Sequence, residues 1–584
     1  MRIFNSFRTN AKKYWETLNE LTGRSKASCY LNKINDSDGS ELTDKSEIAN
    51  AFNQYFSRIP DILERDVPIC TDFSPTHFVP YISNSVFMAP TTEEEILRII
   101  RSLKNSSYGV GSPNTVLFKK VSVVLAPIIS NLINECFVTG AYPLVLKSAS
   151  ITPVFKGGDR LSLTDYRPIS ILCLLNKIFE KSIHVRLNKF IKDNEILYSH
   201  QYAYQKGINT TDAIMNLTEA LYKNLNEKLY CASLFIDLRK AYDTVNHAIL
   251  LRKLEKYGFR GVVSELIKNY LTDRSQCVRV GDAISSFSKV KTGVPQGSVL
   301  GGTLFLLYIN DLAYVSSKFK TTLFADDTVF TLSHPNYQSL IENFNNELVM
   351  ISSWMKVNRL SLNTSKTFAI NFSNRNITNP LSLVINDTVI EWKSSIRYLG
   401  VILDKKLNFS DHIDVLCTKI SRLVGLMYRV SFFVPSDTLR VLYYSLIYPH
   451  LLYGNLVWGG TCNTSLNRVL ILQKKCVRLI MSKPYRFPTE TLFSQAKVLR
   501  IKNIHSYVCA LYAYPNLHSF RLSSHEHNTR NRNLLVPEFQ RLTVCQKSIA
   551  FSVPNVYNQL PQELKSSSSF SIFKSKLKVY FQDQ

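Results

Sequence analysis

Two apolar segments that end in carboxylates constrain this chain more than any other feature of its 584 residues. Segment 229–237, LYCASLFID, is rich in strand-forming residues and ends at Asp237. Segment 321–332, TTLFADDTVFTL, is apolar on both sides of Asp326 and Asp327, a pattern that predicts strand, turn and strand. A charged side chain at the end of an apolar strand is costly unless it faces solvent or a cation.

If the two strands lie side by side, these carboxylates meet at one edge of a sheet. Carboxylate oxygens suit Mg²⁺, which takes one or two carboxylates and completes its shell with water and substrate phosphates. Two such ions about 3.5–4 Å apart stabilise the attacking and leaving oxygens of a phosphoryl transfer. For Asp326 and Asp327 alone, the alternative is an ordinary hairpin turn, in which Asp is common.

The charge balance predicts a polyanionic partner. The chain has 70 Lys and Arg against 45 Asp and Glu, a net charge of +25, and residues 440–584 alone have 19 basic and 5 acidic residues. Such an excess is typical of proteins that bind nucleic acid or an anionic membrane surface.

The membrane alternative is disfavoured by the two most apolar stretches, 298–315 and 441–460, because both contain polar residues. A membrane span needs about 20 mostly apolar residues, so we expect buried core, no membrane contact, and nucleic acid as the partner. The eleven cysteines include no CxxC pair, which favours reduced packing cysteines in an intracellular protein over disulfides or zinc.

Hydrophobic periodicity gives a coarse element map. We expect a hairpin near 277–291, a strand over 396–403, and helices over 1–60, 93–139 (interrupted at 105–113), 242–270, 337–356 and much of the chain beyond about 410.

Three short motifs occur in a fixed order, FIDLRKAYD (235–243), GVPQGS (293–298) and FADD (324–327). In this order they resemble the A, B and C motifs of the reverse transcriptase family, specifically that of non-LTR (LINE-like) retrotransposons. Segments 148–172, 354–367 and 397–404 add matches in the same family, with 354–367 expected to be a helix. YPHLLYGNLVWG (448–459) and VPNVYNQLP (553–561) are similar to jockey-like elements.

The resemblance implies an α+β fold, the right-hand polymerase with fingers, a palm built on an antiparallel sheet, a helical thumb, and a basic, mainly helical C-terminal region. The expected boundaries are 1–84 for an N-terminal extension, 85–230 for fingers, 231–405 for palm, 406–485 for thumb and 486–584 for the C-terminal region, with a reverse transcriptase domain of about 136–405.

The implied function is RNA-directed DNA polymerisation, in which dNTPs are added to a DNA primer 3′-OH on an RNA template with two Mg²⁺, or Mn²⁺ as a substitute. The nucleus is the expected location. Because the chain begins where the linker after the family's endonuclease would begin, endonuclease activity is expected from elsewhere. The alternative is a catalytically silent, decayed copy that only binds nucleic acid. A group II intron maturase is disfavoured by FADD and by the C-terminal matches.

By the same resemblance, Asp237 and Asp326 would hold the two metal ions, with Asp327 beside them. Ile236 would contribute its backbone carbonyl.

The resemblance also assigns residues to the incoming nucleotide. Tyr242 falls at the steric-gate position that excludes a ribose 2′-OH, the alternative being a core tyrosine. Gln296 would contact the incoming nucleotide and the template, while Gly293 and Gly297 allow close backbone approach.

Basic residues complete the implied site. Lys156 and Arg167 would grip the triphosphate, with Arg160 as a rival to either. Lys366 matches a helix-borne lysine proposed to protonate pyrophosphate, the alternative being an ordinary surface lysine. YLGV (398–401) would form a strand near the primer terminus.

The basic run Lys474, Lys475 and Arg478 has two interpretations that the sequence leaves open. It is either a solvated helix face or a nucleic-acid contact.

Overall fold

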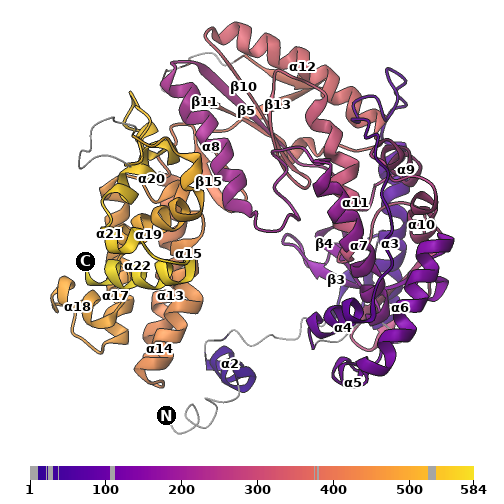
Figure 1. Cartoon of the computed structure of the whole chain (residues 1–584), viewed down its shortest axis with the longest axis horizontal. Coiled ribbons are helices and arrows are strands. Elements are labelled where there is room, and N and C mark those ends of the chain that lie inside the picture. Colours follow the sequence, from indigo (N-terminus) through magenta and orange to yellow (C-terminus); the bar gives the residue numbers. More distant parts are fainter. Residues whose placement is uncertain are drawn as a thin grey trace.

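The chain forms two arms that are joined by a central sheet (Figure 1). The computed structural model describes residues 11–21, 23, 31–36, 38–105, 109, 112–373, 375, 377, 381–523 and 534–584. One arm contains most of the first 310 residues, the sheet lies at the top of the view, and the C-terminal helices form the other arm. The fold therefore mixes helices and sheets, as the α+β prediction requires.

The central sheet has six strands in the order β12-β13-β11-β5-β10-β9. They are β5 (Tyr230–Ile236), β9 (Lys320–Phe324), β10 (Asp327–His334), β11 (Phe368–Phe372), β12 (Leu383–Ile385) and β13 (Thr388–Trp392). β5 lies between β10 and β11 and is buried along almost its whole length, which explains its unbroken apolar run.

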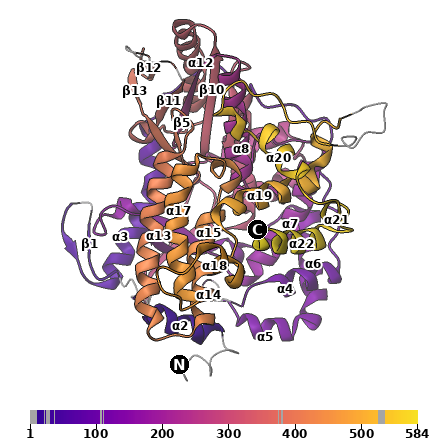
Figure 2. The ribbon, with the colours of Figure 1, turned by 90° about the vertical axis from the view of Figure 1, so that its left-hand side faces the viewer.

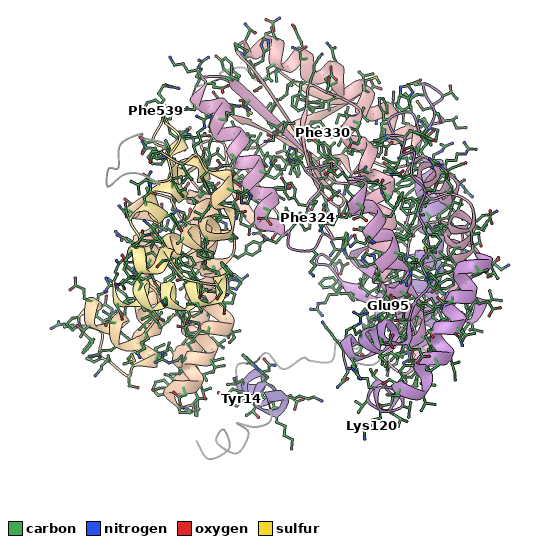
Figure 3. All side chains as sticks on the ribbon, in the orientation of Figure 1. Tyr14, Glu95, Lys120, Phe324, Phe330 and Phe539 are labelled. Atoms are coloured by element: carbon green, nitrogen blue, oxygen red, sulfur yellow. The ribbon has the colours of Figure 1, made fainter. Side chains whose placement is uncertain are left out.

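Helices cover both faces of this sheet. Alternate residues of β5 enter two different hydrophobic cores, one with α12 (Tyr337–Val357) and the other with α8 (Thr210–Asn226). The same alternation places Phe330 of β10 inside the first core (Figure 3). The expected strand, turn and strand of 321–332 and the helix at 337–356 are both confirmed.

A second sheet supports the first arm, with strand order β4-β3-β6-β7 and β8 paired to β6. Its strands are β3 (Ser148–Phe155), β4 (Tyr166–Ile171), β6 (Arg274–Val280), β7 (Ala283–Ile284) and β8 (Ser288–Val290), so the hairpin predicted near 277–291 is confirmed. Helix α3 (Lys45–Arg65) begins at its N-cap Asp44 and packs Phe52 and Phe56 into the core on this sheet.

Most helices of the first arm lie in the predicted regions, whereas those at 174–193 and 299–309 lie outside them. The helices of this arm are α4 (Glu93–Ser102), α5 (Thr115–Lys120), α6 (Ser122–Thr139), α7 (Leu174–Asp193), α9 (His247–Lys256), α10 (Val262–Leu271) and α11 (Val299–Ile309). Almost every residue of α11 is buried, as expected for segment 298–315. Within the described residues, α6 is the one helix whose length and composition would allow it to cross a membrane, and 39% of it is buried.

A buried ion pair connects this arm to helix α12, which covers the central sheet. Lys253 Nζ of α9 lies 2.6 Å from Asp311 Oδ1, and both side chains are fully buried. The other oxygen, Asp311 Oδ2, accepts a 3.0 Å hydrogen bond from Trp354 Nε1 of α12. Lys253 also donates to the carbonyl of Tyr308 over 2.7 Å, so both charges are satisfied by more than one partner.

The C-terminal arm is helical, as predicted. Its helices are α13 (Ser410–Ser431), α14 (Ser436–Leu442), α15 (Tyr448–Leu452), α16 (Asn455–Trp458), α17 (Asn463–Ile480), α18 (Thr489–Ala496), α19 (Ile501–Ala513), α20 (Ile549–Asn558), α21 (Gln562–Lys565) and α22 (Phe570–Asp583). The long helices α13 and α17 run side by side (Figure 2). One hydrophobic core extends through the arm as far as Phe581.

The N-terminal helix α2 (Ala11–Leu21) packs on this C-terminal arm (Figures 1 and 3). Leu18 is buried in the C-terminal core. The Tyr14 hydroxyl donates to Thr438 Oγ1 of α14 over 2.8 Å. Helix α2 therefore shares a hydrophobic core with α22, while α3 packs on the other arm.

Three expectations are corrected by the structure. The helical region expected over 1–60 is interrupted, because β1 (Ile34–Asn35) and β2 (Glu41–Leu42) form a short antiparallel pair. Segment 396–403 is a hairpin of β14 (Ser395–Tyr398) and β15 (Val401–Asp404), because Leu399 and Gly400 turn the chain with φ of 43° and 85°. Segment 354–367 is not one helix, because α12 ends at Val357.

The buried ion pair gives a stability prediction. Asp311→Ala should destabilise the chain by about 3–5 kcal/mol, since it leaves Lys253 charged without its partner. Lys253→Met combined with Asp311→Leu should recover most of that loss, because both charges are then absent. Hydrogen exchange of amides in α9 and α12 would measure both effects. If the double variant loses as much protection as Asp311→Ala does, the unpaired charge of Lys253 is not the source of the destabilisation.

Candidate active site

The carboxylates meet where β5 and β10 end. These strands are antiparallel with Thr328 opposite Ile236, so Asp237 and Asp327 follow at the same edge. Asp326 lies in the turn between β9 and β10, next to Ala325 with its φ of 56°. Ile236, Asp237 and Asp327 line a groove of about 540 Å³. The predicted meeting of the two strands is confirmed.

Neighbouring carboxylates oppose the ionisation of Asp326 and Asp327. Desolvation first, and then the neighbouring charges of Asp326 and Asp237, raise the pKa of Asp327 to about 6. Desolvation and the charge of Asp237 also raise the pKa of Asp326. A cation placed among these groups would relieve both effects.

Asp237 is held by the loop that follows α12. Asn363 Nδ2 donates to Asp237 Oδ2 over 2.7 Å, and the Asn363 amide donates to the Asp237 carbonyl over 2.9 Å. The Asp237 amide in turn donates to Thr367 Oγ1 over 3.4 Å. Sequence reasoning did not single out Asn363, although its segment matched the family.

The donor set fits a hard divalent cation that is completed by other oxygens. In the part of the chain that the structure describes, no three His, Cys, Asp or Glu side chains are placed to hold a metal by themselves. Mg²⁺ does not need such a cage, because it retains waters and binds through one or two carboxylates together with phosphate oxygens. Asp237, Asp326 and Asp327 are the residues that would hold it.

Lys156 and Arg167 lie close enough to the carboxylates for their charges to interact. Arg167 is on β4 opposite Val154, and its charge lowers the pKa of Asp326 and of Asp327 against the effects that raise them. Lys156 has its pKa lowered by desolvation and then by the charge of Lys366.

The predicted rival Arg160 is placed differently. Its guanidinium lies 5.0 Å from the ring centroid of Phe155. Lys156 Nζ lies 4.0 Å from Asp165 Oδ1, in the same hairpin region as Arg160.

Lys366 lines the carboxylate groove but is not on a helix as expected. It lies in the short 3-10 turn Thr364–Lys366. The helix α12 ends nine residues earlier because Arg359 adopts a φ of 52°, which no helix continues. Tyr398, Leu399 and Gly400 line the same groove, but they form a hairpin turn and not the strand that YLGV was expected to form.

Tyr242 has its ring against the interior and its hydroxyl at the surface. The ring stacks on Phe305 of α11, with centroids 4.1 Å apart and planes at 23°. Its hydroxyl is hydrogen bonded to the Tyr204 hydroxyl over 2.8 Å. Desolvation and the hydrogen bond with Tyr204 raise the pKa of Tyr242, so it stays protonated.

Gln296 lies in a turn that requires glycine on both sides. A Cβ on Gly293 would lie 2.6 Å from the Asp243 carbonyl oxygen, and one on Gly297 would lie 2.9 Å from that of Ser170. Gly293 and Gly297 also have positive φ, 82° and 110°. The turn is fixed to β4 because the Ser170 amide donates to the Gln296 carbonyl over 2.8 Å.

Asp243 is a residue of this site that sequence reasoning missed. Gln296 Nε2 donates to Asp243 Oδ1 over 2.8 Å. The other oxygen, Asp243 Oδ2, is buried and has no hydrogen-bond partner among the described residues. Burial raises the pKa of Asp243 to about 6. Its place in FIDLRKAYD was the only available signal, and it did not indicate a contact with Gln296.

Comparison with known proteins gives consistent matches. Residues 154–403 match the family model described as reverse transcriptase (RNA-dependent DNA polymerase). The chain is 29% identical over 467 residues to the probable RNA-directed DNA polymerase from transposon BS of Drosophila melanogaster, which covers 77% of this chain and 50% of that protein.

Two further Drosophila melanogaster proteins are similar. The probable RNA-directed DNA polymerase from transposon X-element is 30% identical over 409 residues, 68% of this chain and 43% of its own length. The RNA-directed DNA polymerase from mobile element jockey is 27% identical over 459 residues, 74% of this chain and 49% of its own length. The chain thus spans about half the length of these curated relatives.

The raised pKa of Asp243 predicts how its replacement depends on pH. Since the folded pKa of about 6 exceeds the ordinary 3.8, this group favours the folded state fully below pH 4 and loses that contribution as pH rises through 6. Asp243→Asn should therefore stabilise the chain at pH 8, by roughly 2–3 kcal/mol, and not at pH 4. Thermal melts at both pH values, with exposed Asp282→Asn as the control, would measure this. A gain of equal size at both pH values would contradict it.

Proposed function

We propose that this chain, whose residues 154–403 match the reverse transcriptase family model, synthesises DNA on an RNA template. It adds dNTPs to the 3′-OH of a DNA primer. The observation that carries this proposal is the β5–β10 pairing, which brings Asp237 and Asp327 into one groove with Lys366. The curated relatives support it, because their names describe RNA-directed DNA polymerases of transposons.

The proposed chemistry is nucleotidyl transfer with two Mg²⁺ ions, for which Mn²⁺ can substitute. Asp237 and Asp326 would hold the ions, assisted by Asp327 and the Ile236 carbonyl. When bound, the ions would stabilise negative charge on the attacking 3′-oxygen and the leaving pyrophosphate.

The remaining side chains have roles that suit their chemistry. Lys156 and Arg167 bind the triphosphate, where the planar guanidinium can make paired contacts. Lys366 donates a proton to the departing pyrophosphate. Gln296 and Gly297 contact the nascent base pair, and the Tyr242 ring occupies the volume that a ribose 2′-OH would need.

The proposed architecture is a right hand. Residues 85–230 are fingers, 231–405 are the palm, 406–485 are the thumb, 486–584 are a basic C-terminal region, and 1–84 are an extension. The two arms support fingers and thumb on either side of a palm that is built on the central sheet (Figure 1). We further propose that the template is RNA, that a separate endonuclease supplies the primer end, and that the chain acts in the nucleus.

The carboxylate assignment predicts a non-additive loss of activity. Asp237→Ala and Asp326→Ala should each abolish primer extension on poly(rA)/oligo(dT) with Mg²⁺, and the double variant should be no worse, because residues that act as one unit are not additive. Exposed Asp414→Ala of α13 is the matched control and should stay active. Full extension by either single variant would remove these residues from the site, and a wild-type chain that binds the duplex without extending it would favour a decayed, binding-only copy.

The basic C-terminal surface predicts a salt dependence of binding. Exposed Lys475 and half-buried Lys474 of α17 are the variants of choice. Arg478 is unsuitable, because it donates to the Phe487 carbonyl over 3.2 Å. Affinity should fall with salt, with a log–log slope of about −0.9 per phosphate neutralised on B-DNA or −0.7 on single strands. Lys474→Glu with Lys475→Glu should flatten that slope. An unchanged slope would mean that these lysines form only a solvated helix face.

A further inference from the structure

Tyr204 makes a direct contact with the proposed sugar gate from a different part of the chain. It lies in segment 200–205, between α7 and α8, and its side chain is 62% exposed. Its hydroxyl and that of Tyr242 are 2.8 Å apart and share a hydrogen bond. Its φ of 53° is a sparsely populated conformation for a residue other than glycine. Such conformations persist only where the surroundings hold them, and they concentrate at functional sites.

The rings of Tyr204 and Tyr242 both pack on one face of α11. Phe305 stacks under the Tyr242 ring. One turn earlier on the same face, a Cβ on Gly302 would lie 3.2–3.3 Å from three ring atoms of Tyr204. The absence of a side chain at Gly302 therefore lets the Tyr204 ring lie directly on the helix.

Hydrogen bonds connect the backbone around Tyr204 to the β9–β10 hairpin, whose turn contains Asp326. The Tyr202 amide donates to the Leu323 carbonyl over 2.9 Å, and the Leu323 amide donates to the His200 carbonyl over 2.9 Å. The buried Gln201 Oε1 accepts from the Ala325 amide over 3.1 Å, directly before Asp326. The Tyr204 hydroxyl is thus placed relative to the metal-binding edge by three hydrogen bonds.

These contacts restrict Tyr242 in complementary ways. The stack on Phe305 sets the plane of its ring, whereas the bond to Tyr204 holds the hydroxyl end of that ring. Neither contact by itself fixes the ring edge that would face a bound sugar.

We propose that Tyr204 is a specificity-determining positioning residue, whose hydroxyl holds Tyr242 where its ring excludes a ribose 2′-OH. This inference rests on the proposed polymerase function and on Tyr242 as its gate. Without the Tyr204 hydroxyl, the free end of the Tyr242 ring can move away from the sugar. Discrimination against ribonucleotides then falls, while the carboxylates and the triphosphate contacts stay in place.

The test uses the full chain with single-nucleotide insertion of matched dNTP and rNTP on an RNA template. Tyr204→Phe keeps the ring on Gly302 and removes one oxygen atom. The dNTP-to-rNTP ratio of kcat/KM should fall about 2- to 10-fold, the effect of one lost hydrogen bond. The kcat/KM for dNTP and the melting temperature should stay close to wild type. Tyr428→Phe of α13, far from the site, is the matched control.

A double-variant cycle separates positioning from mere loop stability. Tyr242→Val should lower the ratio more than Tyr204→Phe does, and adding Tyr204→Phe to Tyr242→Val should cause no further loss, because coupled residues are not additive. If Tyr242→Val lowers the ratio and Tyr204→Phe leaves it unchanged, the role of Tyr204 is overturned and the gate stands. If wild type does not extend, or Tyr242→Val leaves the ratio unchanged, the underlying function or gate is wrong and this inference fails with it.

Discussion

The antiparallel pairing of β5 with β10 is the constraint on which the site depends. Side chains alternate across a strand, so a slip by one residue would move every side chain of β10 to the opposite face. A buried polar pair opposes such a slip, because Ser233 and Thr331 lie directly opposite each other and their hydroxyls are 2.8 Å apart. In any other register both hydroxyls would be buried without this partner, which is costly. The hydrophobic faces and one hydrogen bond together determine where the carboxylates lie.

Holding the carboxylates of Asp326 and Asp327 close together lowers the stability of the folded chain. Asp326 and Asp327 have raised pKa values because they lie among other carboxylates at a partly desolvated edge. The surrounding structure offsets this cost with the apolar side chains that it buries in the two hydrophobic cores on either side of the sheet. Functional sites are commonly built in this way, with a rigid scaffold that holds charges which would otherwise move apart.

Much of this arrangement could be predicted from the sequence, because strands that are buried on both faces leave long apolar runs. The strands over 148–155 and 166–171 could not, since Pro153 and Pro168 interrupt them and proline argues against strand. The hairpin at Leu399 and Gly400 resembles a single strand in sequence, because its turn has only two residues.

Three site residues could not be recognised from the sequence for a different reason. Asn363, Asp243 and Tyr204 act through contacts with residues far away in sequence, and no local pattern records such contacts. Lys366 was expected on a helix because its segment resembled one block of the family. The left-handed conformation of Arg359 that ends α12 has no signature in the residue type.

The position of α2 sets a limit on how far the two arms can separate. α2 belongs to the C-terminal arm through Leu18 and Tyr14, whereas α3 belongs to the other arm. Only ten residues lead from Leu21 to Leu31, and ten residues reach at most about 36 Å when fully extended. This stretch of chain is a tether of fixed maximum length. Any opening of the arms that needs a longer span must first release α2 from the C-terminal core, or Leu31 and Ile34 from the core on the second sheet.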